Sequence, residues 1–471
     1  MKKLFFVLYF AVPLLMLSGS SASAQSSEAL AAQLAAQDIR DELLSTELKT
    51  VYNLRETIHH TLLINPDLEG MRYNRDTLQY QVQSAYGEYL PHLDVTGGIG
   101  GGWKQELTPN APTSSRGFSD RLQGGVSLSQ LLFDGWKASG NIAQNQALLD
   151  SSRKRYLDNA EVYSLDAIVV YMETLRNWGL VDLAEQNVTT HQNILVSLSE
   201  RQELGAGSAA DVVQTQARLA RAESSLEETK SAADISVASF LRTVGAIPDP
   251  SIAFPEDPRG LVPPSVEAFV QSTLENNPKI KAYQKDIEAA QNAVTVARSA
   301  LFPEFYAVAS ANTDQWDGRD YQTNDYAVML TMRWNLFSGF SDVNNIKAAA
   351  SRVRESQATL RSLEYSLRQE SQASWREYLA ATRMVKLLEA TVGYNDQTRE
   401  YYRQQFEVGQ RSLLDVLDAE NEYFTNSSQL LTWRANEYIA IYRLASLRGA
   451  LLSGLGVDNA LYDIDQLPVK E

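Results

Sequence analysis

The sequence Leu-Phe-Asp-Gly at residues 132–135 returns as Leu-Phe-Ser-Gly at residues 336–339, and this repetition decides the fold. In both copies the interval from the glycine to an Asp-Val pair, at residues 211–212 and 415–416, is 76 residues. A constant interval over so long a segment is typical of a structural unit that is present twice. The 76 residues therefore form a rigid element in each copy.

The repetition extends toward the N-terminus of each copy. Asn65-Pro66 returns as Asn277-Pro278, and 25 residues after each of these prolines comes a second proline, Pro91 or Pro303. Only the stretch from that second proline to the glycine differs in length, with 44 residues in the first copy and 36 in the second. Variation confined to one window indicates that the only free loop of each unit lies there.

The N-terminus has the features of a secretory signal peptide. Two lysines precede an apolar run at residues 4–17, and small residues at 22–24 form a cleavage site before Gln25. We therefore predict a signal peptide over residues 1–24 and export of the mature chain from the cytoplasm. An N-terminal helical extension is predicted over residues 25–50.

The composition narrows the possible environments and partners. After the signal peptide, no stretch approaches the ~18 uninterrupted apolar residues that a membrane-spanning helix needs, so any membrane span must be built from strands. The chain has no cysteine, which excludes disulfides, thiolate metal sites and a lipid-modified cysteine. A net charge of -16 argues against nucleic acid and anionic membrane surfaces as partners.

Two long segments, residues 138–204 and 341–408, have the composition of helices. Neither contains a proline, and both are rich in Ala, Gln, Leu, Glu, Arg and Ser. At 1.5 Å per residue, each helix would be roughly 100 Å long. Helices of that length imply coiled-coil-like packing or a helical tube rather than a compact globule.

A break that contains glycine follows each long helix, at residues 203–208 and 407–412, and a second helix is predicted to run back. The long segments therefore form helical hairpins over residues 138–245 and 341–453. A proline-rich stretch that cannot form a regular helix separates the two copies. The predicted organisation is a first repeat at 51–247, a linker at 248–264, a second repeat at 265–455 and a tail at 456–471.

The window of variable length in each copy changes from helical to strand periodicity. Apolar residues alternate with other residues from Tyr326 to Leu336, over about eleven residues, which is the length of a transmembrane strand. We predict strands over about 92–133 and 304–337. Aromatic residues near the strand ends suit a membrane–water interface: Trp103, Phe118, Trp316, Tyr321, Tyr326 and Trp334. One such hairpin alone is equally compatible with a water-exposed β-hairpin that carries ordinary aromatic pairs.

Two strand hairpins supply four strands, which cannot close a barrel in lipid. The unpaired edges would cost several kcal/mol for each buried backbone group. The chain must therefore associate, and a homotrimer would supply twelve strands that continue as a helical tube of the same symmetry. The predicted fold class is mainly α with a transmembrane β-barrel and an internal duplication.

These motifs, in this order and each present twice, resemble those of the TolC family of trimeric outer-membrane export channels. The matching residues are Asn65-Pro66, Leu90-Pro91, the segment 132–135, their second copies, and Phe-Glu-Val-Gly-Gln-Arg-Ser-Leu-Leu-Asp-Val-Leu-Asp at 406–418. The resemblance covers nearly everything after residue 50. It implies a TolC-like trimer with a 12-stranded barrel in the outer membrane of a Gram-negative bacterium and a long α-helical barrel across the periplasm. It also implies a closed tip that opens on meeting an inner-membrane complex.

The resemblance implies a gate at the hairpin tips. In the family, an arginine after the tip glycine bonds an aspartate of the other hairpin, and the matching residues here are Arg411 and Asp211. Phe406 stands where relatives often have a tyrosine that also joins the gate, and it has no hydroxyl. Without the resemblance, Arg411 and Asp211 would be interpreted as a solvated pair worth ~0–1 kcal/mol.

The glycine turns at the tips have a second implied role. Gly205, Gly207, Val408 and Gly409 form the predicted turns. In the family, such turns also dock the periplasmic adaptor protein. The tip turns are therefore expected to serve both the hairpin structure and the assembly with the adaptor.

Asp415 and Asp418 are candidates for an acidic constriction. They are three residues apart on one helix, so both carboxylates lie on the same face. The family uses such positions as a ring around the channel axis, with six carboxylates in a trimer. Crowded like charges raise the pKa values of their carboxyl groups and attract multivalent cations. The alternative is an ordinary solvated helix face in an acidic protein.

The function implied is a passive conduit for cargo that an inner-membrane ABC transporter and a periplasmic adaptor deliver. The segment around Arg411 looks most like the branch that serves type I secretion of large adhesins and toxins. The alternatives are the outlet of a drug or metal efflux pump and a periplasmic coiled-coil adaptor or structural protein. An enzyme is not predicted, because the four histidines have no metal-ligand spacing and no catalytic constellation stands out, so no cofactor or metal is expected.

Overall fold

The computed structural model describes residues 49–105, 116–205, 208–316 and 321–457. The predicted signal peptide, nearly all of the predicted N-terminal extension and most of the predicted tail lie outside these residues. Within the described part of the chain, no helix combines the length and the apolar character that crossing a bilayer requires.

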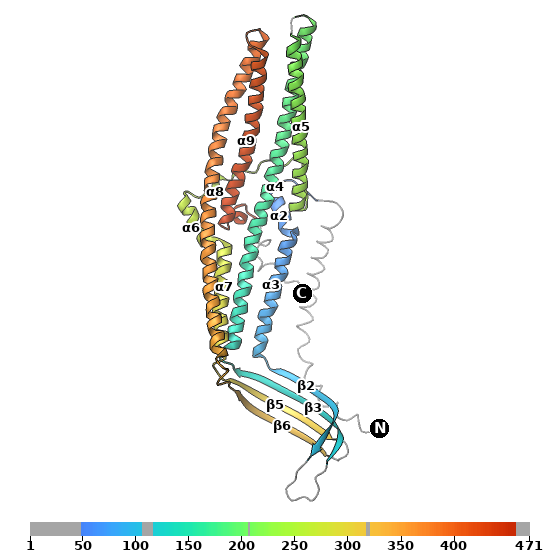
Figure 1. Cartoon of the computed structure of the whole chain (residues 1–471), viewed down its shortest axis with the longest axis vertical. Helices are drawn as coiled ribbons and strands as arrows, with labels where there is room; N and C mark the ends of the chain where they lie inside the picture. Colours follow the sequence, from blue (N-terminus) through green and yellow to red (C-terminus); the bar gives the residue numbers. More distant parts are fainter. Residues whose placement is uncertain (1–48, 106–115, 206–207, 317–320, 458–471) are drawn as a thin grey trace.

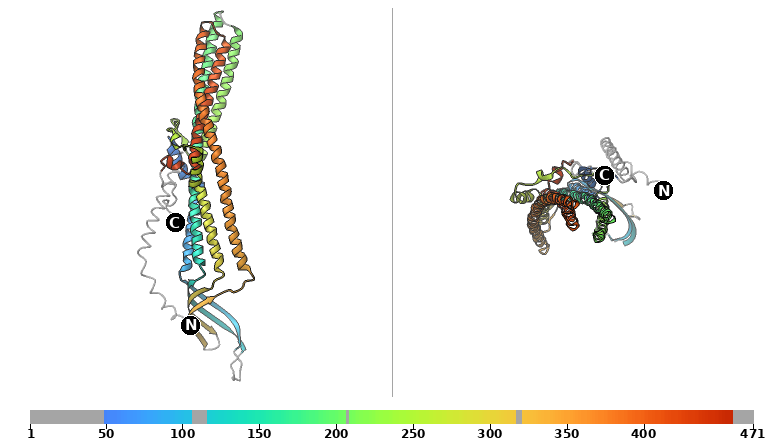
Figure 2. Two further views of the ribbon diagram at one scale, coloured as in Figure 1. Left: turned by 90° about the vertical axis from the view of Figure 1, so that its left-hand side faces the viewer. Right: turned by 90° about the horizontal axis from the view of Figure 1, so that it is seen from above.

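Two helical hairpins make up most of the molecule (Figure 1). The first consists of α4 (Lys137–Glu203) and α5 (Ala209–Val244), and the second of α8 (Ser341–Glu407) and α9 (Leu413–Leu447). Helices α4 and α8 each have 67 residues, which corresponds to about 100 Å. Seen from above, the hairpins follow an arc (Figure 2), so that one chain has the shape of a segment of a tube.

Shorter helices complete the helical body. Helix α3 (Pro66–Tyr86) packs against α4, and α7 (Pro278–Ser299) packs against α4 and α8. Both begin at the repeated Asn-Pro pair, because the asparagine side chain accepts hydrogen bonds from the first turn and the proline needs no acceptor there. The remaining short elements are α2 (Leu54–Ile64), α6 (Val266–Asn276), α10 (Leu451–Gly454) and the 3-10 helices η1 (Gly87–Tyr89) and η2 (Pro258–Leu261).

The repeated motif that ends in glycine turns the chain from strand into helix. Gly135 (φ 69°) and Gly339 (φ 64°) have a left-handed backbone, as do the next residues Trp136 (φ 67°) and Phe340 (φ 64°). A Cβ added at Gly135 would also lie 2.9 Å from the carbonyl oxygen of Ser299. Glycine is therefore required at this corner by both its conformation and its close contact.

The polar residue of the same motif caps the long helix that follows. The carboxylate of Asp134 accepts hydrogen bonds from the backbone N–H groups of Lys137 (3.0 Å) and Ala138 (2.7 Å). In the second copy, the Ser338 hydroxyl accepts a hydrogen bond from the backbone N–H of Asp342 at 3.3 Å and donates one to its carboxylate. Both versions satisfy N–H groups that the first helical turn leaves unpaired.

Between the helices the chain forms a four-stranded antiparallel sheet with the order β2-β3-β5-β6. Strands β2 and β6 are its edges, and the sheet lies at the opposite end of the molecule from the hairpin tips (Figure 1). The strands are β2 (His92–Gln105), β3 (Arg116–Phe133), β5 (Glu304–Trp316) and β6 (Tyr321–Arg333).

The last strand is shorter than the alternation of its sequence indicates. We expected strand structure up to about residue 337, but β6 ends at Arg333. The next residue, Trp334, donates a hydrogen bond from its indole N–H to the carbonyl oxygen of Leu301 at 3.3 Å. This contact joins the departing chain to the corner before β5, so residues 334–338 connect the sheet to the glycine turn.

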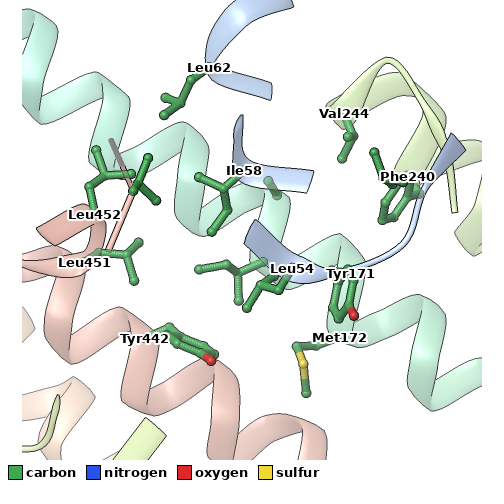
Figure 3. Close-up of a cluster of buried hydrophobic side chains, with 14 of the residues drawn as sticks. Leu54, Ile58, Leu62, Tyr171, Met172, Phe240, Val244, Tyr442, Leu451 and Leu452 are labelled. Carbon is green, nitrogen blue, oxygen red and sulfur yellow. The ribbon is translucent and has the colours of Figure 1, made fainter. Parts of the chain in front are cut away.

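The main hydrophobic core lies at mid-height, where the two ends of the described chain meet. Strand β1 (Thr50–Val51) pairs in parallel with β4 (Ile247–Pro248). Helices α2 and α10 then add side chains to α4, α5 and α9, as Figure 3 shows for Leu54, Ile58, Leu62, Tyr171, Met172, Phe240, Val244, Tyr442, Leu451 and Leu452. Each large apolar side chain buried in this way contributes about 1.5–3 kcal/mol, so the cluster holds both repeats together.

A buried carboxyl group connects this core to the short helix α10. Glu161 of α4 is only 2% exposed, and its carboxyl oxygens accept hydrogen bonds from the backbone N–H groups of Leu451 (3.0 Å) and Leu452 (3.4 Å). Burial raises the pKa of Glu161 to about 8. Folding therefore favours the protonated carboxyl group. The stability associated with this group is present below the unfolded-state pKa and is lost as the pH rises through about 8.

We expect Glu161→Gln to weaken the pH dependence of stability. The wild-type protein should lose thermal stability between pH 5 and pH 9, in part because Glu161 must ionise inside the core. The variant has no ionisable group at this position and should lose less. Melting temperatures of the detergent-solubilised protein measure the difference, with Glu377→Gln as a control at an exposed carboxylate. An equal loss in wild type and Glu161→Gln would contradict this role.

Candidate channel gate and membrane face

The predicted tip turns lie at the far end of both hairpins. Gly205 and Gly409 each have a φ of 77°, the left-handed conformation that ends a helix. Ser208 and Ser412 then cap the returning helices, because their hydroxyl oxygens accept hydrogen bonds from backbone N–H groups. Val408 is exposed beside its turn. Gly207 lies outside the described residues.

A small apolar cluster joins the two hairpins close to their tips. Its members come from all four long helices, so it connects the first repeat to the second. The buried members are Leu198, Val212, Leu413 and Leu417, and Ile194, Leu195 and Phe406 pack against them. We call these seven residues the tip cluster. Its packing provides a contact between the hairpins that does not depend on charge.

Phe406 makes a cross-hairpin contact that needs no hydroxyl. The guanidinium carbon of Arg201 on α4 lies 5.0 Å from the centre of the Phe406 ring on α8. A cation over an aromatic face contributes about 0.5–1 kcal/mol at an exposed site. The residue that lacks the tyrosine hydroxyl therefore still links the two hairpins, through its ring.

Arg411 has its ionic partner on its own hairpin. Its Nη1 atom lies 3.8 Å from the carboxylate of Asp415, and its guanidinium carbon lies 3.9 Å from the centre of the Tyr402 ring. Its Nε atom is buried, with no hydrogen-bond partner among the described residues. Asp211 lies in the first turn of α5. The contact between Arg411 and Asp211 stays a prediction about the assembled channel.

Both candidate ring carboxylates have an arginine within the same chain. Asp415 also accepts a hydrogen bond from the Ser412 hydroxyl at 2.8 Å, in addition to its contact with Arg411. Asp418 on α9 lies 3.2 Å from a guanidinium nitrogen of Arg218 on α5. One chain therefore presents two charge-compensated carboxylates at these positions.

Sequence reasoning missed Arg201 and Arg218. Both act between different repeats, and the hydrophobic period of a helix does not determine which surface residue meets which partner on a distant helix. A comparison of the two repeats nevertheless contains a signal that could have identified Arg218. With the 204-residue offset between copies, Arg218 corresponds to Glu422, so the two repeats have opposite charges at one position.

The register of the sheet separates the side chains into two faces. One row of opposed residues crosses all four strands as Leu93, Leu128, Ala309 and Val328. The next row is Asp94, Ser127, Ser310 and Ala327. Because successive side chains in a strand point to opposite faces, one face of the sheet is apolar and the other is mainly polar. A strand pattern of this kind suits lipid on one side and water on the other.

Three of the predicted interface aromatics lie on the apolar face. Trp103 and Phe118 oppose each other near the far ends of β2 and β3, and Tyr326 lies on β6. All three are exposed in a single chain, with Tyr326 at 81%. Their assignment to a membrane interface stays a prediction.

The other predicted aromatics are arranged differently. Trp316 lies on the polar face, where the guanidinium of Arg121 is 4.9 Å from its ring and its indole N–H donates a hydrogen bond to Asp314 at 3.2 Å. Tyr321, the first residue of β6, pairs with Trp316 across the strands. Trp334 lies just beyond the sheet. The structure therefore does not bring the six aromatics together on one face.

A family model described as outer membrane efflux protein matches this chain twice. The matched residues are 57–246 and 269–450. Each match includes one strand hairpin and one helical hairpin, so the internal duplication corresponds to two copies of the family's own unit.

Individual proteins agree with the family match. The chain is 23% identical over 346 residues to outer membrane efflux protein BepC of Brucella suis biovar 1, over 72% of this chain and 74% of that protein. It is 22% identical over 336 residues to alkaline protease secretion protein AprF of Pseudomonas aeruginosa, over 69% of each chain. A crystal structure of CusC matches with a TM-score of 0.73 at 14% identity, over 84% of this chain and 92% of that one. The predicted fold class is confirmed.

We expect Leu417→Ala to loosen the closed tip. The Leu417 side chain is fully buried in the tip cluster, and truncating a buried leucine typically costs about 2–5 kcal/mol. Larger or more frequent openings in a planar bilayer are the expected result. Leu388→Ala, at a buried site of α8 outside the tip cluster, is the control for a general loss of packing. Wild-type conductance in correctly assembled Leu417→Ala would show that the tip cluster does not hold the channel closed.

Proposed function

We propose that this chain, which belongs to the outer membrane efflux protein family, has a specific task among the outer-membrane channels of that family. That task is the passive exit of a large secreted protein by the type I pathway. An inner-membrane ABC transporter would supply the energy, and a periplasmic adaptor would connect it to the channel. The cargo would be an adhesin or toxin. The family is one of channels rather than enzymes, and the chain's own contribution is a duct.

The four-stranded sheet is the observation that best supports a channel. It has one apolar face, one mainly polar face and two open edges, β2 and β6. In lipid an open edge costs several kcal/mol per unpaired backbone group, so β6 of one copy must pair with β2 of the next. Three copies give twelve strands, with the polar faces lining the duct and the apolar faces in outer-membrane lipid.

The gate belongs to the same proposal. Arg411 would bond Asp211 in the closed assembly, Phe406 would contribute its ring contact with Arg201, and Asp415 with Asp418 would surround the axis. The exposed turns that contain Gly205, Val408 and Gly409 would dock the adaptor, together with Gly207. Support comes from the position of all described members within about two helical turns of the two tips.

Type I secretion is favoured by the tip segment and by one relative. Residues 406–418 resemble the secretion branch, and AprF is named as an alkaline protease secretion protein. The second candidate is the outlet of a drug or metal efflux pump. The similarity to BepC, which is named as an efflux protein, favours it. Both candidates share the same duct and differ in the inner-membrane partner.

Deleting the gene in its own host separates the two candidates. If the proposal holds, one or a few very large polypeptides disappear from the culture medium, and sensitivity to dyes, drugs and metal ions changes little. Proteomics of the medium and growth inhibition measure the two effects, with the plasmid-borne wild-type gene as control. Unchanged secretion with increased drug or metal sensitivity would support the efflux outlet instead.

Charge reversal tests the gate pair. Arg411→Glu should raise single-channel conductance or admit large antibiotics, because it would place a negative charge near Asp211. Adding Asp211→Arg should partly restore closure. Each exposed pair is worth only ~0–1 kcal/mol, but three symmetric copies act together. Mass measurement in detergent must first show three chains in wild type and variants. If trimeric Arg411→Glu keeps wild-type conductance and antibiotic sensitivity, the assignment of Arg411 and Asp211 as a gate fails.

A further inference from the structure

The ion pair between Arg218 and Asp418 joins the two repeats of one chain near the tips. Arg218 lies on α5 of the first hairpin, and Asp418 lies on α9 of the second, with 3.2 Å between guanidinium nitrogen and carboxylate oxygen. Helix α9 begins at Leu413, so the carboxylate is within the second turn from the tip. If the hairpins move apart, this pair must break.

The duplication shows that this contact is not a shared property of the two repeats. With the 204-residue offset, Arg218 corresponds to Glu422, and Asp418 corresponds to Gln214. At these two positions α5 has the basic Arg218 and the neutral Gln214. Helix α9 has the acidic residues Glu422 and Asp418. The two copies of the unit have therefore diverged in charge at the two positions that form this ion pair.

Two titratable neighbours, Asp415 and His191, do not compete with the contact between Arg218 and Asp418. Asp415, the other carboxylate on this face of α9, has Arg411 at 3.8 Å and the Ser412 hydroxyl at 2.8 Å. Burial and the charge of Arg218 lower the pKa of His191 on α4, so this buried imidazole is neutral at neutral pH and does not compete for the carboxylate.

The pair is accessible enough to be broken reversibly. The Arg218 side chain is 30% exposed and that of Asp418 is 55% exposed. Water competes for both charged groups at such exposures, so the pair adds little to folding stability. The main effect of the pair is on the electrostatic field beside Asp418, because a guanidinium at hydrogen-bond distance cancels most of the field of the carboxylate.

We propose that Arg218 determines ion specificity at the tip: it neutralises Asp418 while the hairpins are together and leaves it bare when they separate. Opening and cation selectivity are thereby coupled, because the number of uncompensated carboxylates around the axis rises as the tip opens. The inference rests on the proposed acidic constriction, which it deepens by assigning the residue that controls its charge.

Two substitutions that break the same pair have opposite effects on selectivity. Arg218→Gln leaves an uncompensated carboxylate, so it should increase cation over anion permeability and lower the blocking concentration of a trivalent cation several-fold. Asp418→Asn leaves an uncompensated guanidinium, so it should decrease cation preference and weaken the block. Both variants should open more readily than wild type, since both lose the contact between the hairpins.

Reversal potentials in a KCl gradient and titration with hexaamminecobalt(III) in planar bilayers measure these effects. Lys230→Gln is the matched control, because Lys230 lies 3.5 Å from Glu185 at a similar exposure but joins α5 to α4 within one hairpin. The control should leave selectivity and opening near wild type. Selectivity that shifts in the same direction in Arg218→Gln and Asp418→Asn, or in neither, would overturn the proposal.

Cross-linking provides a test that does not depend on a measurement of ion selectivity. The chain has no cysteine, so Arg218→Cys with Asp418→Cys introduces the only thiols. A short thiol-reactive cross-linker should join them within one chain and reduce conductance. Bands of linked dimers or trimers would mean that the pair forms between chains, which contradicts the proposed contact. If the wild-type protein forms pores but the cross-link within one chain or the fall in conductance is not observed, Arg218 lacks this role. If the wild-type protein forms no pores, the proposed channel function itself is wrong.

Discussion

The need to pair every backbone hydrogen-bonding group inside a membrane governs the rest of this structure. One chain supplies a sheet with a single apolar face and two open edges, β2 and β6. Such a sheet is stable in lipid only when other copies complete it. The long helices leave the sheet through the glycine-aromatic turns at residues 135–136 and 339–340. Closing the sheet therefore also places the helical hairpins around a common axis.

The second requirement is that both hairpins reach the same height. Helices α4 and α8 have 67 residues each, and the returning helices α5 and α9 have 36 and 35. A difference of one heptad would displace one tip by about 10 Å. The tip cluster and the pair Arg218–Asp418 could not then form. Equal length explains why the 76-residue interval is constant. The segment from Pro91 or Pro303 to the following glycine contains the strand hairpin, is under no such requirement and differs in length between the copies.

The sequence predicted what local chemistry and duplication determine. Helix lengths, the strand alternation and the glycine turns all follow from residues close together in the chain, and the predicted family and fold class are confirmed. Contacts between repeats were not predictable in the same way. Arg201 meets Phe406, and Glu161 binds the backbone of α10, across separations of hundreds of residues. Trp316 was assigned by its place near a strand end, but the register puts it on the polar face beside Arg121.

The tip combines two kinds of contact with different physical properties. The tip cluster removes apolar surface from water, and its contribution is not weakened by the screening of charges. The charged contacts of Arg411 and Arg218 are partly exposed, so each is weak, and counterions or a docking partner can replace them. A partner that supplied its own charges at the tip could thus exchange the ion pairs at little cost. The apolar cluster would be the larger barrier, because separating the hairpins exposes Leu413 and Leu417 to water. A partner that opens the tip must therefore offer apolar surface as well as charge.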